Sequence, residues 1–233
     1  MTFLMKRSYT PVPVGTTASF STVFAYLPPI GTPSGKRVYV WPGLNGDNSQ
    51  WSTSPFDTLI SNFTAAGHSV VEIVEPNSNP ANFTNGGWQY RAAFNAAINT
   101  IMNAVEAQHG PVPKNIAGGA SYGGLHSMMA FAMNGRFYGW WAHEPVTELC
   151  ELNPEYAGLT IGEAYRFDPF FEVAALKNTK GWISNGTQDT RVNGPLCGTL
   201  MAKLGSVQQV TYDQEHETNA QNVTDISAWV NDV

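Results

Sequence analysis

Charged side chains are scarce in this sequence. Only 13% of its 233 residues are charged, about half the share that is usual in globular proteins. Lysine and arginine together number 12, against 18 aspartates and glutamates, which gives a formal net charge of −6. No cluster of basic residues is present, so we expect no nucleic-acid partner. The mild acidic excess also argues against a strongly anionic substrate.

Long hydrophobic runs and cysteines are few as well. No stretch approaches the ~20 apolar residues of a membrane span, and the apolar run within residues 1–7 is too short for a secretory signal. The compartment is left unassigned, with the cytoplasm as the default and an extracellular or virion-associated location as alternatives. Cys150 and Cys197 are too few for a disulfide framework. Two separate buried thiols are favoured, although the sequence leaves their pairing open, as it does the oligomeric state.

What the sequence does contain is an alternation of strand-like and helix-like segments. Its length and its hydrophobic content of 42% suffice for a single domain over residues 1–233. Residues 8–17 are expected to be extended, and strands are predicted at 18–27, 37–41, 68–74, 115–120, 137–142, 181–184 and 207–212. Helices are predicted at 51–65, 89–108, 122–134, 167–176, 195–204 and 219–233. From Arg37 onward this alternation predicts an α/β fold, with a mostly parallel central sheet and helices on both faces.

One serine lies among glycines between a predicted strand and a predicted helix. The pattern Gly119-x-Ser121-x-Gly123 is what a tight strand-to-helix turn needs if it must hold a serine hydroxyl exposed in a strained backbone conformation. Small residues are required on both sides because a side chain there would collide with the strand or the helix. Serine among glycines is common in loops, so the motif alone is weak.

Two further residues strengthen the interpretation of Ser121 as a nucleophile, because each follows the end of another predicted strand. Asp189 comes just after the strand at 181–184, and His216 just after the strand at 207–212. Functional groups of parallel α/β sheets gather beyond the carboxyl ends of the strands. A serine nucleophile needs a base within hydrogen-bond reach and a third group that orients this base. Ser121, Asp189 and His216 are therefore the candidate catalytic residues.

The order of these three residues resembles that of the α/β-hydrolase superfamily, over nearly the whole chain from Arg37. The segment Gly-Ala-Ser-Tyr-Gly is similar to the family's nucleophile motif, Gly186-x-x-Asp189 to its acid loop, and the late His216 to its base. The resemblance implies an α/β-hydrolase fold with a short insertion at 143–166 in place of a large lid. It also implies an oxyanion hole made by the backbone amides of Tyr122 and Leu44, the latter in the Pro42-Gly43-Leu44 loop.

Other residues are candidates for contact with substrate or for the same roles. Gly43, Trp88, His143 and Glu144 are the predicted substrate-binding residues, because each lies in a loop or at a strand end near the expected site. Glu144 is also the best substitute for Asp189 as the acid. His126 lies on the helix that leaves Ser121, where packing or a surface position is favoured over catalysis. No metal-ligand spacing and no dinucleotide fingerprint is present, so we expect neither metal nor cofactor.

The sequence thus favours a serine esterase acting on a small-molecule ester with a short or polar acyl group. One alternative is a peptidase or amidase, because Ser121-Tyr122-Gly123-Gly124 also resembles the elbow of prolyl-oligopeptidase-like enzymes, although their large additional domain is missing. The other is a catalytically silent binding module on the same fold, which the weakly charged surface would suit.

Overall fold

The computed structural model describes residues 9–14, 20–43, 50–74, 91–147, 169–192 and 194–233. The strands are β1 (Tyr9–Val14), β2 (Phe20–Leu27), β3 (Lys36–Trp41), β4 (Ser69–Val74), β5 (Lys114–Ala120), β6 (Phe137–His143), β7 (Gly181–Gly186) and β8 (Gln208–Tyr212). The helices are the short 3₁₀ segment η1 (Gln50–Ser52), α1 (Phe56–Ala65), α2 (Arg91–His109), α3 (Tyr122–Met133), α5 (Val173–Leu176), α6 (Gly194–Lys203) and α7 (Ala220–Asp232).

The strands form one eight-stranded sheet in the order β1-β2-β4-β3-β5-β6-β7-β8. β1 and β2 are antiparallel to their neighbours, and all pairings from β4 through β8 are parallel. Parallel neighbours need a crossover between them, and the helices supply it. The predicted mostly parallel sheet is confirmed. The segment expected only to be extended, residues 8–17, contains the edge strand β1.

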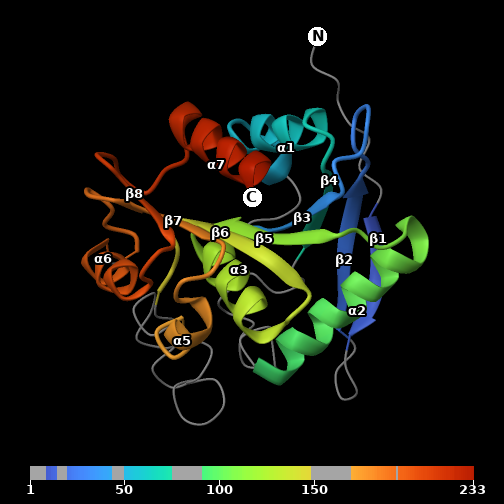
Figure 1. Cartoon of the computed structure of the whole chain (residues 1–233), viewed down its shortest axis with the longest axis horizontal. Coiled ribbons are helices and arrows are strands. Elements are labelled where there is room, and N and C mark those ends of the chain that lie inside the picture. Colours follow the sequence, from blue (N-terminus) through green and yellow to red (C-terminus); the bar gives the residue numbers. More distant parts are fainter. Residues whose placement is uncertain (1–8, 15–19, 44–49, 75–90, 148–168, 193) are drawn as a thin grey trace.

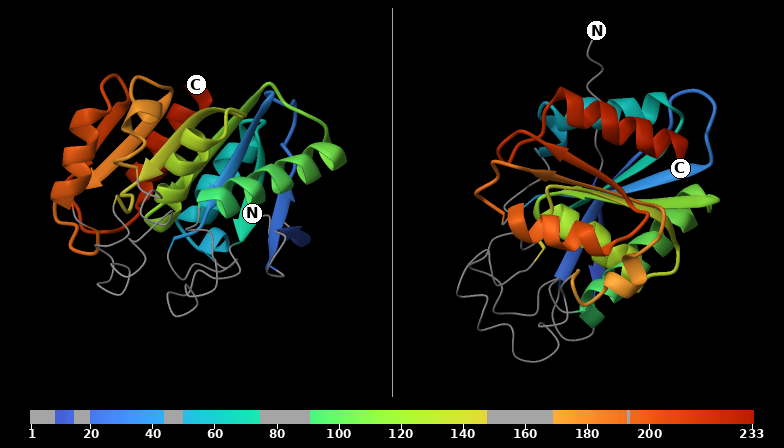
Figure 2. Two further views of the ribbon diagram at one scale, coloured as in Figure 1. Left: turned by 90° about the horizontal axis from the view of Figure 1, so that it is seen from below. Right: turned by 60° about the vertical axis from the view of Figure 1, so that its left-hand side comes forward.

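Helices cover both faces of the sheet, as predicted (Figures 1 and 2). α1 and α7 lie on one face, while α2, α3, α5 and α6 lie on the other. Two clusters of buried hydrophobic side chains fill the space between sheet and helices, one on each face. The neighbouring side chains of Trp140 and Trp141 belong to different clusters, because successive residues of a strand point to opposite faces.

Two predicted helices are shorter than expected. α1 begins at Phe56 and not at Trp51, because Pro55 has no amide hydrogen and cannot lie inside a helix without breaking its hydrogen-bond ladder. α5 spans only Val173–Leu176. Residues 169–172 form turns instead, in which the amide of Glu172 donates to the carbonyl of Pro169. Among the helices in the described part of the chain, none combines the length and the apolarity needed to cross a bilayer.

The carboxyl ends of the parallel strands meet in register along one edge of the sheet. Trp41 of β3 pairs with Gly119 of β5, Ala120 of β5 pairs with His143 of β6, and His143 pairs with Ser184 of β7. The loops that follow these strands therefore start side by side, although they are far apart in the sequence.

Candidate active site

Ser121 lies in the turn between β5 and α3. Its φ of 56° and ψ of −122° belong to a region that non-glycine residues rarely adopt, and such strain persists only where the surroundings fix it. The amide of Ser121 donates to the carbonyl of His143 over 2.9 Å, and its carbonyl accepts from the amide of Val146 over 3.1 Å. The end of β6 and the residues that follow it thus hold the serine backbone on both sides.

The two glycines that flank Ser121 are required by close backbone contacts. A Cβ atom on Gly119 would collide with the backbone of Gly123, and one on Gly123 would collide with the carbonyl oxygen of Trp41. Strand β3, the end of β5 and the start of α3 therefore approach more closely than a side chain allows. Both glycines are therefore sterically required, as expected from the sequence.

His216 and Asp189 are joined by a hydrogen bond. Nδ1 of His216 lies 2.7 Å from Oδ2 of Asp189, where the histidine side chain is 14% exposed and that of the aspartate is fully buried. The other carboxylate oxygen of Asp189 accepts from the amides of Arg191 at 2.9 Å and Val192 at 3.0 Å. Because a carboxylate only accepts hydrogen bonds, Nδ1 carries the imidazole hydrogen and Nε2 is left as the basic nitrogen.

The turn after β7 and the turn after β8 are fastened to each other. The amide of Thr187 donates to the carbonyl of Tyr212, and that of Gln188 donates to the carbonyl of Gln214. Asp213 accepts from the side chains of Thr187 and Gln188, and these hydrogen bonds, from Gln188 first, lower the pKa of its carboxyl. The acid and the base therefore stand on two turns with a fixed relative position.

The predicted oxyanion donors are only partly within the described residues. Tyr122 is the first residue of α3, so its amide lies at the positive end of a helix dipole. Gly43 lies beside the serine, since a Cβ atom built on it would be 3.7 Å from Cβ of Ser121. Its amide donates to Oε1 of Gln50 over 2.8 Å. Leu44 and Trp88 lie outside the described residues, so their predicted roles stay predictions.

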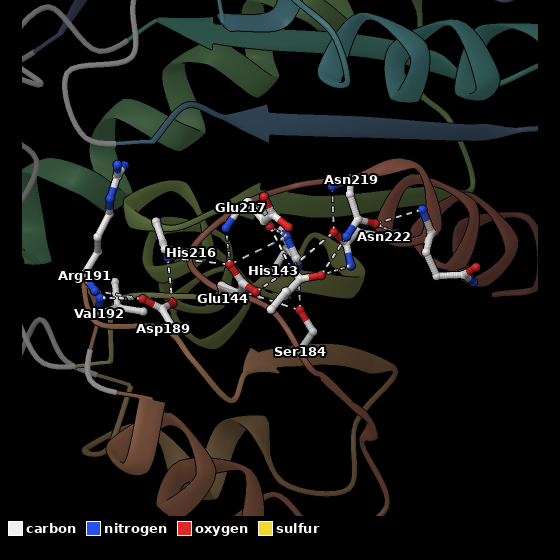
Figure 3. A network of polar contacts seen from close by, with 12 residues as sticks. His143, Glu144, Ser184, Asp189, Arg191, Val192, His216, Glu217, Asn219 and Asn222 are labelled. Carbon is white, nitrogen blue, oxygen red and sulfur yellow. Dashed lines mark hydrogen bonds and ion pairs between the residues drawn. The ribbon is translucent and has the colours of Figure 1, made fainter.

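His143 and Glu144 have side chains that are 1% exposed and point into the protein beneath the turn that carries His216 (Figure 3). His143 accepts from the hydroxyl of Ser184 and donates to the carbonyl of Glu217. Burial lowers the pKa of His143 to about 4 and raises that of Glu144 to about 7. Direct contact of either side chain with substrate stays a prediction.

Two remaining candidates are packed in the interior. His126 is fully buried on α3, with its ring 4.3 Å from that of Tyr122 and 5.2 Å from that of Phe94, so of the two expected roles, packing or surface, it has the packing one. Cys197 is a buried free thiol, and Cys150 lies outside the described residues. The insertion predicted at 143–166 can be followed only through its first five residues, which are buried; residues 148–166 lie outside the described ranges.

Solved structures with the same architecture include esterases and serine hydrolases. The chain matches the esterase Pf2001 of Pyrococcus furiosus with a TM-score of 0.71 at 11% identity, over 97% of this chain and 88% of that one. It matches FphF, a fluorophosphonate-binding serine hydrolase of Staphylococcus aureus, with a TM-score of 0.71 at 16% identity, over 97% and 98%. It matches the S-formylglutathione hydrolase FrmB, also of S. aureus, with a TM-score of 0.69 at 17% identity, over 97% and 99%.

The chain has the α/β-hydrolase fold. No family model and no curated protein matches its sequence. In this fold, the candidate nucleophile follows β5, the candidate acid follows β7 and the candidate histidine follows β8, an order that resembles the one expected from the sequence.

Folding also creates a cluster that sequence spacing did not reveal. Glu144, Asp189 and His216 bring atoms of the kind that bind metals within 4.8 Å of one another. These atoms already have partners, because Nδ1 of His216 bonds to Asp189 and Oε2 of Glu144 accepts from the amide of Glu217. The group is therefore better described as a histidine beside two carboxylates.

Sequence reasoning missed several polar residues that surround this group. They are Ser184, Gln214, Asn219 and Asn222. The hydroxyl of Ser184 bonds to His143 and to the amide of Glu144, and the side chains of the other three hydrogen-bond to one another. Each belongs to a residue type common on any surface, and nothing in its local pattern distinguishes it. Only their burial in the folded chain reveals the network.

Proposed function

We propose that this protein is a serine esterase that cleaves carboxylic esters of short or polar acyl groups through an acyl-enzyme on Ser121. The observation that carries the proposal is the hydrogen bond of 2.7 Å between His216 and a buried Asp189. This pair stands at the same edge of the sheet as a serine in a strained turn. The α/β-hydrolase fold supplies the scaffold for these residues. The proposal itself rests on the site, because function resides in the site and not in the fold.

In the proposed mechanism, Nε2 of His216 takes the proton of Ser121 as Oγ attacks the ester carbonyl. Asp189 holds the imidazole in the required tautomer and stabilises the imidazolium. The amides of Tyr122 and Leu44 bind the oxyanion of the tetrahedral intermediate. The C–O bond to the alcohol then breaks, and the imidazolium returns the proton to the alcohol. A water molecule, activated by the same imidazole, releases the acid and restores Ser121.

The preference for short or polar acyl groups rests on the shortness of the insertion at 143–166, which cannot form a large lid. We expect faster hydrolysis of p-nitrophenyl acetate or butyrate than of the palmitate ester. A higher rate on long-chain than on short-chain esters would contradict this part of the proposal.

A fluorophosphonate probe tests the nucleophile directly, because it reacts covalently with activated serines. The wild-type protein is expected to be labelled, and Ser121→Ala is expected to lose labelling and esterase activity together. Ser61→Ala is the matched control, since Ser61 is exposed on α1. A wild-type protein that forms no adduct dependent on Ser121 would favour the binding-module alternative and overturn the proposal.

The substrate panel then separates an esterase from a peptidase or amidase. Esters and peptide amides with matched acyl groups are compared by kcat/KM. Faster turnover of a peptide amide than of its ester would favour the prolyl-oligopeptidase-like alternative.

A further inference from the structure

Glu144 occupies an unusual position beside the candidate acid and the candidate base. It follows β6 directly, and its φ of 42° is one that a residue with a side chain rarely adopts. Its amide donates to the carbonyl of Ser184 at the end of β7. The strained backbone turns the side chain beneath the turn that carries His216, where it is 1% exposed. Strain of this kind tends to persist at functional sites.

The carboxylate of Glu144 holds the turn that carries His216, residues 214–217, on both sides of the histidine. We call this segment the histidine turn. Oε1 accepts from Nε2 of Gln214 over 2.7 Å, and Oε2 accepts from the amide of Glu217 over 3.0 Å. Gln214 precedes the histidine by two residues and Glu217 follows it directly. A single carboxylate therefore fixes the segment 214–217 at two points.

The same network continues into helix α7. Oε1 of Gln214 accepts from the side chain of Asn219 over 2.8 Å, and Asn219 caps the first turn of α7. His143 donates to the carbonyl of Glu217 over 2.8 Å. Buried polar groups that are satisfied in this way rigidify their surroundings. The network thus fixes the histidine turn relative to both β6 and α7.

Glu144 is also a second carboxylate beside the imidazole. Its Oε2 lies 3.6 Å from Nδ1 of His216, outside hydrogen-bond distance, while Asp189 occupies the bonding position at 2.7 Å. In the described part of the chain, the titratable groups that interact with Glu144 are His143 on β6, Asp189 after β7, Cys197 on α6, Tyr212 on β8, and His216 and Glu217 after β8. A negative charge at this distance stabilises the imidazolium that forms during the proposed reaction.

We propose that Glu144 is a positioning residue for His216, which holds the 214–217 turn and takes over part of the role of Asp189 when that carboxylate is lost. This inference rests on the proposed hydrolytic function. Glu144 acts through the imidazole, and no contact with the substrate is required. A small movement of the imidazole would bring Nδ1 within hydrogen-bond distance of Oε2, because the two atoms are already 3.6 Å apart.

The test compares Glu144→Gln, Asp189→Asn and the double variant, with kcat and KM for p-nitrophenyl acetate and the rate of fluorophosphonate labelling as readouts. Glu144→Gln is expected to lower kcat and labelling by about tenfold, the scale of one charge-assisted hydrogen bond, with little change in KM. In the Asp189→Asn background the same substitution is expected to cost more, about a hundredfold, because the two carboxylates are coupled. If Glu144→Gln lowers kcat by the same factor in the wild type and in Asp189→Asn, the proposal is wrong.

Glu215→Gln is the matched control, since it removes the same charge next to His216 from an exposed side chain. It is expected to leave kcat and labelling within about twofold of the wild type, as surface substitutions usually do. A loss equal to that of Glu144→Gln would mean that overall charge, and not the position of Glu144, matters.

A comparison that leaves Glu144 intact covers the case in which its variants fail to fold. Asp189→Asn is expected to lower kcat by about a hundredfold, which is less than the ~10⁴-fold loss seen when a triad aspartate has no substitute. This variant is also expected to react with the fluorophosphonate probe faster than His216→Ala. Labelling equal to that of His216→Ala would overturn the inference. If the wild-type protein itself fails to label, the proposed function fails; if it labels and only the coupling is absent, only this inference fails.

Discussion

Oε1 of Glu144 and Nε2 of Gln214 form a buried hydrogen bond of 2.7 Å between residues that are 70 positions apart in the sequence. It joins the end of β6 to the turn after β8 and passes directly beneath the candidate catalytic histidine. β6 is an inner strand of the sheet, and β8 is its edge strand. Because of this contact, the position of His216 depends on the end of β6 as well as on the turn after β8.

The buried carboxyl of Glu144 predicts a dependence of stability on pH. Burial is the largest cause that raises its pKa, from 4.5 to about 7. Between these values the folded protein binds more protons than the unfolded chain, so the free energy of unfolding falls as pH rises through this window. The contribution is fully present below pH 4.5 and is lost above about pH 7.

Glu144→Gln removes this titration. Urea unfolding at pH 4.5 and at pH 7.5 should show that the stability of the variant relative to the wild type rises by about 3 kcal/mol between the two conditions. A relative stability that stays constant across the window would contradict the prediction.

The two glycines that flank Ser121 predict that a larger residue at either position causes a steric clash. Gly123→Ala would force a methyl group against the carbonyl oxygens of Trp41 and Pro42. We expect a loss of about 2 kcal/mol or more in the free energy of unfolding, the scale of overpacking a tight site, together with loss of fluorophosphonate labelling. Thermal unfolding and labelling of the same preparation measure both effects.

Gly198→Ala is the control, because a Cβ atom on this glycine of α6 has no neighbour within 4 Å. It should stabilise the protein by up to about 1 kcal/mol, since alanine is the better helix former. If Gly123→Ala unfolds at the temperature of the wild type and is still labelled, the steric argument is wrong.

The cap of α7 predicts a loss of stability with a specific rescue. The side chain of Asn219 accepts from the amides of Gln221 and Asn222 in a capping box. Asn219→Ala should cost about 1 kcal/mol in unfolding free energy, and it also removes a donor to Gln214. Asn219→Asp keeps the capping oxygen but also lacks the donor to Gln214, so it should recover the part of the stability that comes from the cap, as chemical unfolding would measure. Equal losses in both variants would exclude the cap as the cause.

The thiol of Cys197 is predicted to be inert in the folded protein. It is buried, and burial is the main cause that raises its pKa to about 12. Since the thiolate is the reactive form, iodoacetamide at pH 8 should leave Cys197 unmodified until a denaturant is added. Peptide mass mapping distinguishes this site from Cys150. Rapid alkylation of Cys197 under native conditions would contradict the described burial.

Local patterns in the sequence predicted most of the elements and the type of sheet. Strand β3 could be recognised because a short apolar run, Arg37 to Trp41, is followed by a glycine-containing loop, and α2 because apolar residues recur with helical spacing. The segment that ends at Ser121 could be recognised because only glycines permit so tight a turn. Local patterns were weaker at helix ends, where Pro55 delayed the start of α1 by five residues.

The sequence by itself determined which residues are candidates for the chemistry, because a strained serine, a late aspartate and a late histidine each follow the end of a strand. Only the tertiary structure decided their surroundings. Hydrogen bonds between parallel strands brought His143 beside Ala120 and Ser184, and this register placed Glu144 beneath His216. No local pattern encodes such a contact, because it depends on which strands become neighbours and on the burial that their side chains then share.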